Sequence, residues 1–174
     1  MAGQEPIEWF YEKGREPLFS HAEVLEIGAA EGVKNDTLQN WANRRYVLPT
    51  IVGGKRKYTP EEVARIVLAL HLVNEFAVGP VSATKAIHYA LLILHDKIEP
   101  RPGLPKKISF ADAKYQIAVY VENPASQPSL YDARRSALEI FDKGHAFIVL
   151  PIGRLLDALA SRMRRRARLK ERGD

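Results

Sequence analysis

The stretch TIVGGKRKYTPEEV at residues 50–63 decides the expected fold of the first half of the chain. A short β-branched run precedes Gly53-Gly54 and a basic run follows, a pattern typical of two strands joined by a glycine turn. Thr59-Pro60-Glu61-Glu62 then supplies a capping threonine, a proline suited to the first helical position and a glutamate that completes a capping box. The stretch therefore predicts a small hairpin that leads into a helix, whose apolar stripe continues until the Gly79-Pro80 break.

Two further helices are predicted before this hairpin. Ser20 and Glu23 have the spacing of a capping box for the first helix, which ends at Gly32. The second helix is predicted at residues 37–46. Its inward face is expected to consist of Leu38, Trp41 and Ala42, and its cap of Asn35 or Asp36. Two helices separated by a turn of about four residues form a helix-turn-helix in outline.

The second half of the chain predicts a different structure. Ser109 could cap a helix, whereas residues 117–121 have the composition of a strand. The secondary structure of residues 108–122 is therefore left open between helix and strand. Apolar residues at helical spacing predict a helix at 130–141. A buried strand is predicted at 146–150, stopped by a proline, and a final helix runs from residue 152 into an arginine-rich run.

The expected fold class is mainly α with small β. The predicted domains are a lead-in at 1–18, a winged helix-turn-helix at 19–95, a linker at 96–107, an α/β oligomerisation or partner-binding region at 108–161 and a basic tail at 162–174.

Charge is strongly segregated along the chain. Residues 162–174 contain seven bases and two acids, which accounts for the whole net charge of +5. Residues 1–31 carry seven acids and two bases, whereas residues 37–60 carry five bases and no acid. Segregation of this kind favours a polyanionic partner. The basic tail could lie along phosphates, fold only on binding or act as a solubilising segment.

Several classes of function are not expected. The chain has no cysteine, which excludes disulfides and thiolate metal sites. Residues 1–5 lack the pattern of a secretory signal and the apolar runs are too short to span a bilayer, so we expect a cytoplasmic protein without membrane contact. The five histidines have no metal-binding spacing, and no catalytic motif is present. We therefore expect no enzyme, no cofactor and no metal.

Residues 19–95 contain several residues at spacings that are typical of a known protein family. Gly32-Val33 and Thr37-Leu38 fall in the turn and the second helix, and the hairpin and the next helix start add Gly54, Arg56, Tyr58, Thr59, Glu62 and Val63. With these residues the segment resembles the MerR family of winged-helix transcription regulators. Gln39-Asn40-Trp41 departs from the family's usual Arg-Tyr-Tyr, and an α/β segment replaces its long dimerisation helix. Excisionases and the DNA-binding domains of phage terminase small subunits are similar over the same segment.

A recognition helix reads base edges in the major groove with its outward residues, and Asn, Gln and Arg can bond base edges bidentately. The candidate DNA-binding residues of the second helix and its end are Thr37, Gln39, Asn40, Asn43, Arg44 and Arg45. Those of the wing are Lys55, Arg56, Lys57 and Tyr58. Strand alternation sends Lys55 and Lys57 to one face and Arg56 to the other. The resemblance implies that Arg56 binds a phosphate and that Tyr58 is a partly buried neighbour. A solvated polar helix face and a solvated basic hairpin are the alternatives.

The expected function is a sequence-specific regulator that binds double-stranded operator DNA as a homodimer, with residues 108–160 supplying the dimer contact. The alternative is an architectural or assembly protein, excisionase-like or terminase-like, whose second half binds a protein partner. A ligand-sensing second half is a third possibility.

Overall fold

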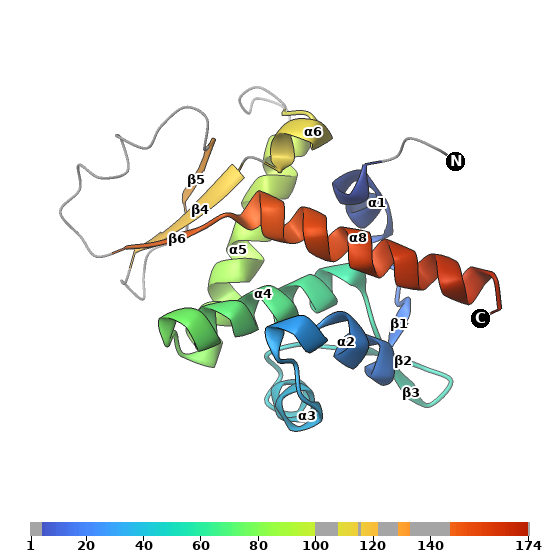
Figure 1. The fold of residues 1–174 in the computed structure, drawn as a ribbon. Helices are drawn as coiled ribbons and strands as arrows, with labels where there is room; N and C mark the ends of the chain where they lie inside the picture. Colours follow the sequence, from blue (N-terminus) through green and yellow to red (C-terminus); the bar gives the residue numbers. More distant parts are fainter. Residues whose placement is uncertain (1–4, 100–107, 115, 122–128, 133–146, 174) are drawn as a thin grey trace.

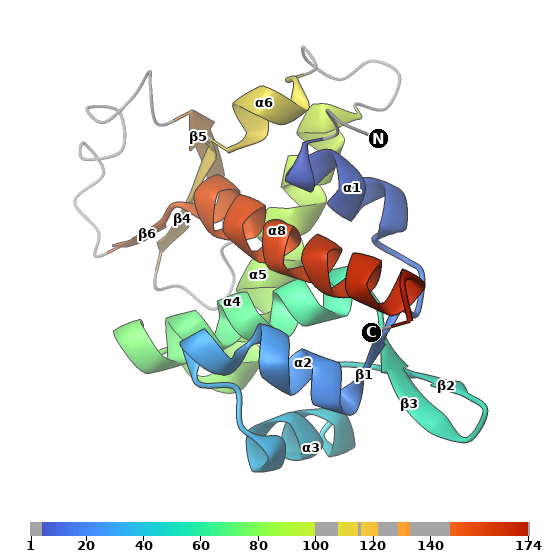
Figure 2. The ribbon, with the colours of Figure 1, turned by 45° about the vertical axis from the view of Figure 1, so that its right-hand side comes forward.

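A computed structural model describes residues 5–99, 108–114, 116–121, 129–132 and 147–173. In this part the chain is mainly helical, with two three-stranded antiparallel sheets (Figure 1). The predicted class of mainly α with small β is therefore confirmed. Figures 1 and 2 place the two sheets at opposite ends of the molecule, with helices between them.

The elements of the first half are α1 (Pro6–Lys13), β1 (Phe19–Ser20), α2 (His21–Ile27), the 3-10 helix η1 (Ala29–Glu31), α3 (Asn35–Asn43), β2 (Thr50–Val52), β3 (Lys55–Tyr58), α4 (Pro60–Phe76) and α5 (Pro80–Ile98). Those of the second half are α6 (Phe110–Ala113), β4 (Gln116–Val121), β5 (Ser129–Asp132), β6 (Phe147–Leu150) and α8 (Ile152–Glu171). Four of these elements were not predicted from the sequence: helix α1 within the lead-in, strand β1, the 3-10 helix η1 and strand β5.

Helix α4 is the centre of the core. Its start is fixed by the predicted capping box, in which the hydroxyl of Thr59 accepts a bond from the Glu62 amide and the Glu62 carboxylate accepts one from the Thr59 amide, at 3.2 and 2.8 Å. Apolar residues are buried on almost every side of the helix, which packs against α5, α8 and α1. A helix that is buried all round requires partners on every face. Those partners come from both ends of the sequence.

The predicted hairpin is present. Strands β2 and β3 pair with Thr50 opposite Lys57 and Val52 opposite Lys55, which leaves Gly53-Gly54 as a two-residue turn. Both glycines have positive φ, 57° and 74°, as a tight hairpin turn of this twist requires. Strand β1 pairs with the other edge of β3 and makes the sheet three-stranded.

The second sheet has the order β5-β4-β6. The helix and the strand that were left open as alternatives for residues 108–122 both occur there: Ser109 caps the short helix α6, and strand β4 follows it. The predicted helix at 130–141 is wrong at its start, since residues 129–132 pair with β4 as strand β5. The rest of that helix lies outside the described residues. The strand expected at 146–150 is confirmed as β6, and α8 begins directly after Pro151.

Two predicted boundaries fall inside helices. Helix α5 continues to Ile98, past the expected linker start at 96, because its last turn still buries Ile98. Helix α8 continues without a break through the expected boundary at 162. Residues 162–171 are therefore the C-terminal half of a packed helix and not a separate tail, since Met163 is fully buried and neighbouring bases pair with acids of α2 and η1.

The turn between α2 and α3 depends on Gly28. A Cβ at this position would lie 2.3 Å from Cγ2 of Val33. The carbonyl of Gly28 also accepts the amide of Val33 at 3.0 Å, which closes the turn around η1. Gly32 follows in the left-handed conformation, with φ 77°, at the predicted end of the first helical segment. This close approach sets the position of α3 relative to α2.

Candidate nucleic-acid interface

Helix α3 begins two residues earlier than predicted, at Asn35, and ends at Asn43. Leu38 and Trp41 are buried as expected, and Ala42 is partly buried. The opposite face carries polar side chains: Gln39, Asn40 and Asn43 are exposed, and Thr37 is half-buried. The helix therefore presents a row of amide side chains to solvent, the residue type that can bond adenine edges.

The end of α3 is closed by two backbone hydrogen bonds, from Tyr46 to the Trp41 carbonyl at 2.9 Å and from Arg45 to the Ala42 carbonyl at 3.1 Å. The rings of Trp41 and Tyr46 also contact each other. This is the Schellman arrangement, which places one residue in the left-handed region and usually uses glycine there. Here that residue is Arg45, with φ 60°. An arginine thus stands where glycine would cost less conformational energy.

The hairpin is fastened to the end of α3. Nη2 of Arg56 donates a hydrogen bond of 3.1 Å to Oδ1 of Asn43. The strand register puts Ile51 beside Arg56 on this face, and Lys55 and Lys57 alternate to the other. The structure therefore brings the exposed amides of α3 and the basic hairpin together. In the same contact Asn43, one of the candidate DNA-binding residues of α3, is the partner of Arg56, the phosphate ligand that the resemblance implies.

Tyr58 does not belong to this surface. Its side chain is completely buried under α2, because the Phe19–Tyr58 pairing of β1 and β3 turns it into the core. The prediction of Tyr58 as a DNA-binding residue is corrected accordingly. Burial raises the pKa of its phenol. Its hydroxyl lies 3.5 Å from Nδ1 of His21, the first residue of α2.

His21 continues a polar chain from the core to α3. Nε2 of His21 lies 2.8 Å from Oδ1 of Asn35, and Gln39 donates to the same oxygen at 3.2 Å. Because that carbonyl oxygen is only an acceptor, His21 donates from Nε2. The chain fixes the rotation of the first turns of α3. The sequence gives no signal for it, since the contacts join residues 14 and 37 positions apart.

A shallow open depression of about 350 Å³ lies between α2, α3 and the hairpin. Its lining residues are Ser20, His21, Ala22, Gln39, Lys55 and Arg56. Arg44 and Arg45 are exposed at the far end of α3. The arrangement offers bases and amides around a concave surface and contains no acidic lining residue.

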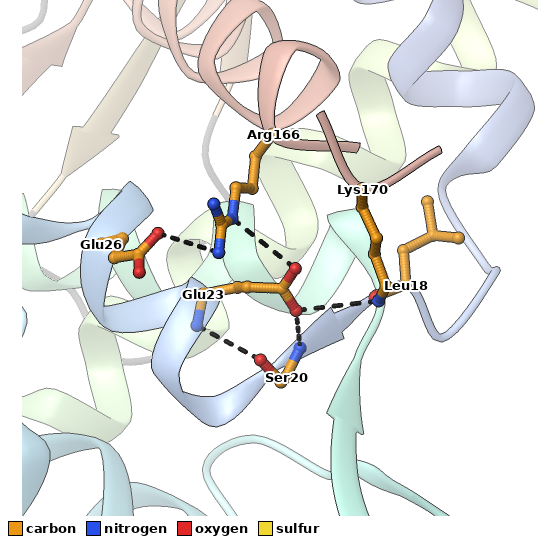
Figure 3. Close-up of polar contacts among 6 residues, drawn as sticks. All are labelled: Leu18, Ser20, Glu23, Glu26, Arg166 and Lys170. Carbon is orange, nitrogen blue, oxygen red and sulfur yellow. Dashed lines mark hydrogen bonds and ion pairs between the residues drawn. The ribbon is translucent and has the colours of Figure 1, made fainter. Parts of the chain in front are cut away.

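Ion pairs hold helix α2 against α8. Figure 3 shows Arg166 reaching both Glu23, with 3.6 Å between Nε and Oε1, and Glu26, with 3.3 Å between Nη2 and Oε2. Lys170 approaches Glu23 at 3.8 Å and donates to the carbonyl of Leu18 at 3.0 Å. Glu23 is therefore both the capping glutamate of α2 and the anion of a three-residue cluster.

Burial alone would raise the pKa of Glu23. The hydrogen bonds from Ser20 and the positive charges of Lys170 and Arg166 outweigh burial, so the pKa of this carboxyl lies below its ordinary value. The acid-rich start of the sequence and its base-rich end thus neutralise each other here. Their opposite charges were the only signal of this contact in the sequence.

Lys57 and Lys170 bring the other face of the hairpin next to α8. Burial and the neighbouring charge of Lys170 both lower the pKa of Lys57. The charge of Glu23 acts on Lys57 in the opposite direction, and its carboxylate lies 3.8 Å from Lys170. The positive charges of Lys57 and Lys170 are therefore partly balanced within the protein.

Within the described residues no group of three or more His, Asp or Glu side chains is placed to hold a metal ion. In the same part of the chain, no helix is both long enough and apolar enough to cross a membrane. Comparison with models of known protein families gives no match. No curated protein matches the chain either.

Proposed function

We propose that the chain is a sequence-specific transcription regulator of MerR-like type that binds double-stranded DNA. In this proposal α2 and α3 form a helix-turn-helix, α3 lies in the major groove, and the β2–β3 hairpin is a wing that lies on the phosphates. Gln39 and Asn40 read bases from the exposed face of α3. Arg56 and Lys55 bind the backbone beside them, and Arg44 and Arg45 bind it at the end of the helix.

The observation that carries the proposal is the hydrogen bond between Arg56 and Asn43. It joins the wing to the recognition helix, so that one duplex can contact both at the same time. The absence of acids among the residues that line the depression between them supports a polyanionic ligand. The left-handed Arg45 adds further support, because a residue held in an unfavourable backbone conformation often serves a function.

A small recognition helix gives limited affinity, and regulators of this kind gain specificity by pairing two copies on a palindromic site. The proposal therefore includes a homodimer, acting in the cytoplasm. Exposed apolar residues on and before α5, Phe76, Val81, Tyr89 and Leu92, also favour association with another protein surface. If that surface belongs to a different protein, the second candidate follows: an architectural or assembly protein that recruits a partner to DNA.

Selection of binding sites from a random duplex library, using the full chain, tests the proposal. The regulator predicts one sharp palindromic site, and the assembly protein predicts a diffuse preference. On the selected site, Asn40→Ala should flatten the preference at one base pair, worth about 1–3 kcal/mol of discrimination. Lys55→Gln/Arg56→Gln should weaken binding to all sequences about equally.

The matched control is Lys13→Gln/Arg15→Gln, which removes the same charge from solvent-accessible positions at and just after the end of α1. It should bind the selected site as the wild type does. Equal losses in the control and the wing variant would show that only net charge matters. No selected site and no effect of Asn40→Ala would overturn sequence-specific recognition.

A further inference from the structure

Helix α8 sorts its basic residues onto two faces. Arg162, Arg166 and Lys170 recur every four residues and pair with acids of η1 and α2. A second row lies on the opposite side of the helix, where Arg164, Arg165, Arg168 and Arg172 line a groove with Pro6, Ser161 and Leu169. The groove holds about 400 Å³ and no acidic residue lines it. Acids of η1 and α2 thus neutralise one face of the helix, whereas the other face carries Arg165, Arg168 and Arg172 at the groove.

The second row costs the helix stability. Arg168 lies four residues from Arg164 and from Arg172, and three from Arg165, so like charges face each other at each helical turn. The helix dipole favours bases only in the last turn, which leaves Arg165 without that compensation. Arg165, Arg168 and Arg172 are exposed, and none of them has an ion pair in the part of the chain that the structure describes. Such a row is expected where an anion binds.

The row faces away from the recognition helix. Pro6 at the start of α1 forms one wall of the groove, and Figures 1 and 2 both place α1 and α3 on opposite sides of α8. A straight duplex on α3 and the wing therefore does not lie on this row.

We propose that Arg165, Arg168 and Arg172 form a second phosphate-binding surface, which holds a stretch of duplex DNA separate from the one bound at α3. The surface goes beyond the proposed function, because it uses neither α3 nor the hairpin. The three arginines cover about 10 Å of helix axis, close to the length of about three phosphates along one DNA strand. Each guanidinium group can bind two oxygens of one phosphate through two parallel hydrogen bonds.

An anionic membrane fits this surface less well. A helix that lies on a membrane needs an apolar face free to enter the lipid. The apolar face of α8, with Leu156, Leu159 and Met163, is buried in the core. Leu169, which lines the groove and is 38% exposed, is a single apolar side chain and too small to anchor the helix in lipid. The surface therefore recognises mainly charge, which suits a phosphodiester backbone.

The test compares three variants of the full chain that each lose three charges. The row variant is Arg165→Gln/Arg168→Gln/Arg172→Gln and the wing variant is Lys55→Gln/Arg56→Gln/Lys57→Gln. The control is Lys13→Gln/Arg15→Gln/Lys85→Gln, at solvent-accessible positions outside α8 and the hairpin. Glutamine is a good helix former, so the row variant should melt at or above the wild-type temperature. Two quantities are measured: the salt dependence of binding to one labelled duplex, and the capture of a second labelled duplex by protein loaded on an immobilised one.

The row variant should lose second-duplex capture at least tenfold. On a single duplex long enough to bend around the protein onto the row, its plot of log affinity against log salt should have a slope shallower by about 2–3 than that of the wild type. On a duplex of about 15 base pairs its affinity should match that of the control. Capture and slope equal to the control would overturn the second surface and leave the proposed function intact.

If the wing variant binds DNA as the wild type does and the row variant loses DNA binding, the proposed function is overturned. The phosphate-binding surface formed by the arginine row would then stand on its own. Vesicles of anionic phospholipid are the last arm. If they bind the wild type but not the row variant, while DNA binding is unchanged, the ligand is a membrane and the proposal is wrong.

Discussion

Arg162 clasps the carboxylate of Glu31 with both terminal nitrogens of its guanidinium group, across 131 residues of sequence. The same guanidinium donates to the carbonyl of Ile27 at 2.9 Å, so it also caps the end of α2. Both side chains are about three-quarters buried, with 26% and 25% of their surfaces exposed. This contact locks α8 onto the turn that positions the candidate recognition helix.

Glu31→Gln should lower the free energy of unfolding by about 1–2 kcal/mol, because it weakens a charged, two-pronged hydrogen bond that is partly shielded from water. Arg162→Gln should do the same, and the double variant should be less destabilised than the sum of the two. Urea titration followed by circular dichroism measures all three. The control is Glu16→Gln, at an exposed pair with Lys13, which should leave stability almost unchanged. Strict additivity at Glu31 and Arg162 would show that the two do not interact in solution.

Arg45→Gly should stabilise the protein by about 1 kcal/mol, because glycine adopts positive φ without the steric cost that arginine bears. The same change should weaken DNA binding, since it removes a base at the end of α3. Ala77→Gly is the matched control: Ala77 also has positive φ, 54°, but lies at the end of α4 away from the proposed surface. It should raise the melting temperature and leave binding unchanged. Tighter or equal binding by Arg45→Gly would remove Arg45 from the interface.

Acid should weaken the contact between α2 and α8. The folded-state pKa of Glu23 is lowered, so its contribution to stability is complete above the ordinary value of 4.5 and is lost as the pH falls through the folded-state value. The stability difference between wild type and Glu23→Gln should therefore be constant from pH 5 to 7, at about 1–2 kcal/mol, and shrink below about pH 4.5. Chemical denaturation at several pH values measures it. A difference that grows on acidification would contradict the assigned direction of the pKa.

Asn43 and Arg56 should act as one unit in DNA binding. If Asn43 mainly holds Arg56 in place, Asn43→Ala should weaken binding to all sequences and add little to the effect of Arg56→Gln. The measurement is the affinity of the two single variants and the double variant for the selected site and for an unrelated duplex. A change of preference at one base pair, kept in the Arg56→Gln background, would instead identify Asn43 as a base reader.

Local signals predicted much of the first half of the fold. Ser20, Thr59 and the Gly53-Gly54 turn each act within a few residues, and the structure has the two caps and the hairpin at the predicted positions. The start of α3 was missed because Asn35 bonds His21 from within the helix and does not act as its cap. Strand β1 was missed because two residues are too few to show a period.

The long-range part of the site could not be predicted. Tyr58 fits a hairpin by its position, but its burial depends on the pairing of β1 with β3, which joins distant residues. The arginine-rich run at the C-terminal end looked like a tail because its apolar positions become sparse after Met163. Its helical continuation is stabilised by acids of α2 and η1, and the sequence does not show which acids face which bases.

The capping glutamate of α2 obtains its compensating cations from a helix that is synthesised more than a hundred residues later. Until α8 emerges from the ribosome, α2 and η1 expose Glu23, Glu26 and Glu31 beside the surface that is proposed to bind a polyanion. Without α8 these acids would oppose the polyanion binding that we propose, whereas with α8 they are paired with bases. The charge balance of α2 and η1 therefore depends on α8, and so would any polyanion binding at the surface that we propose.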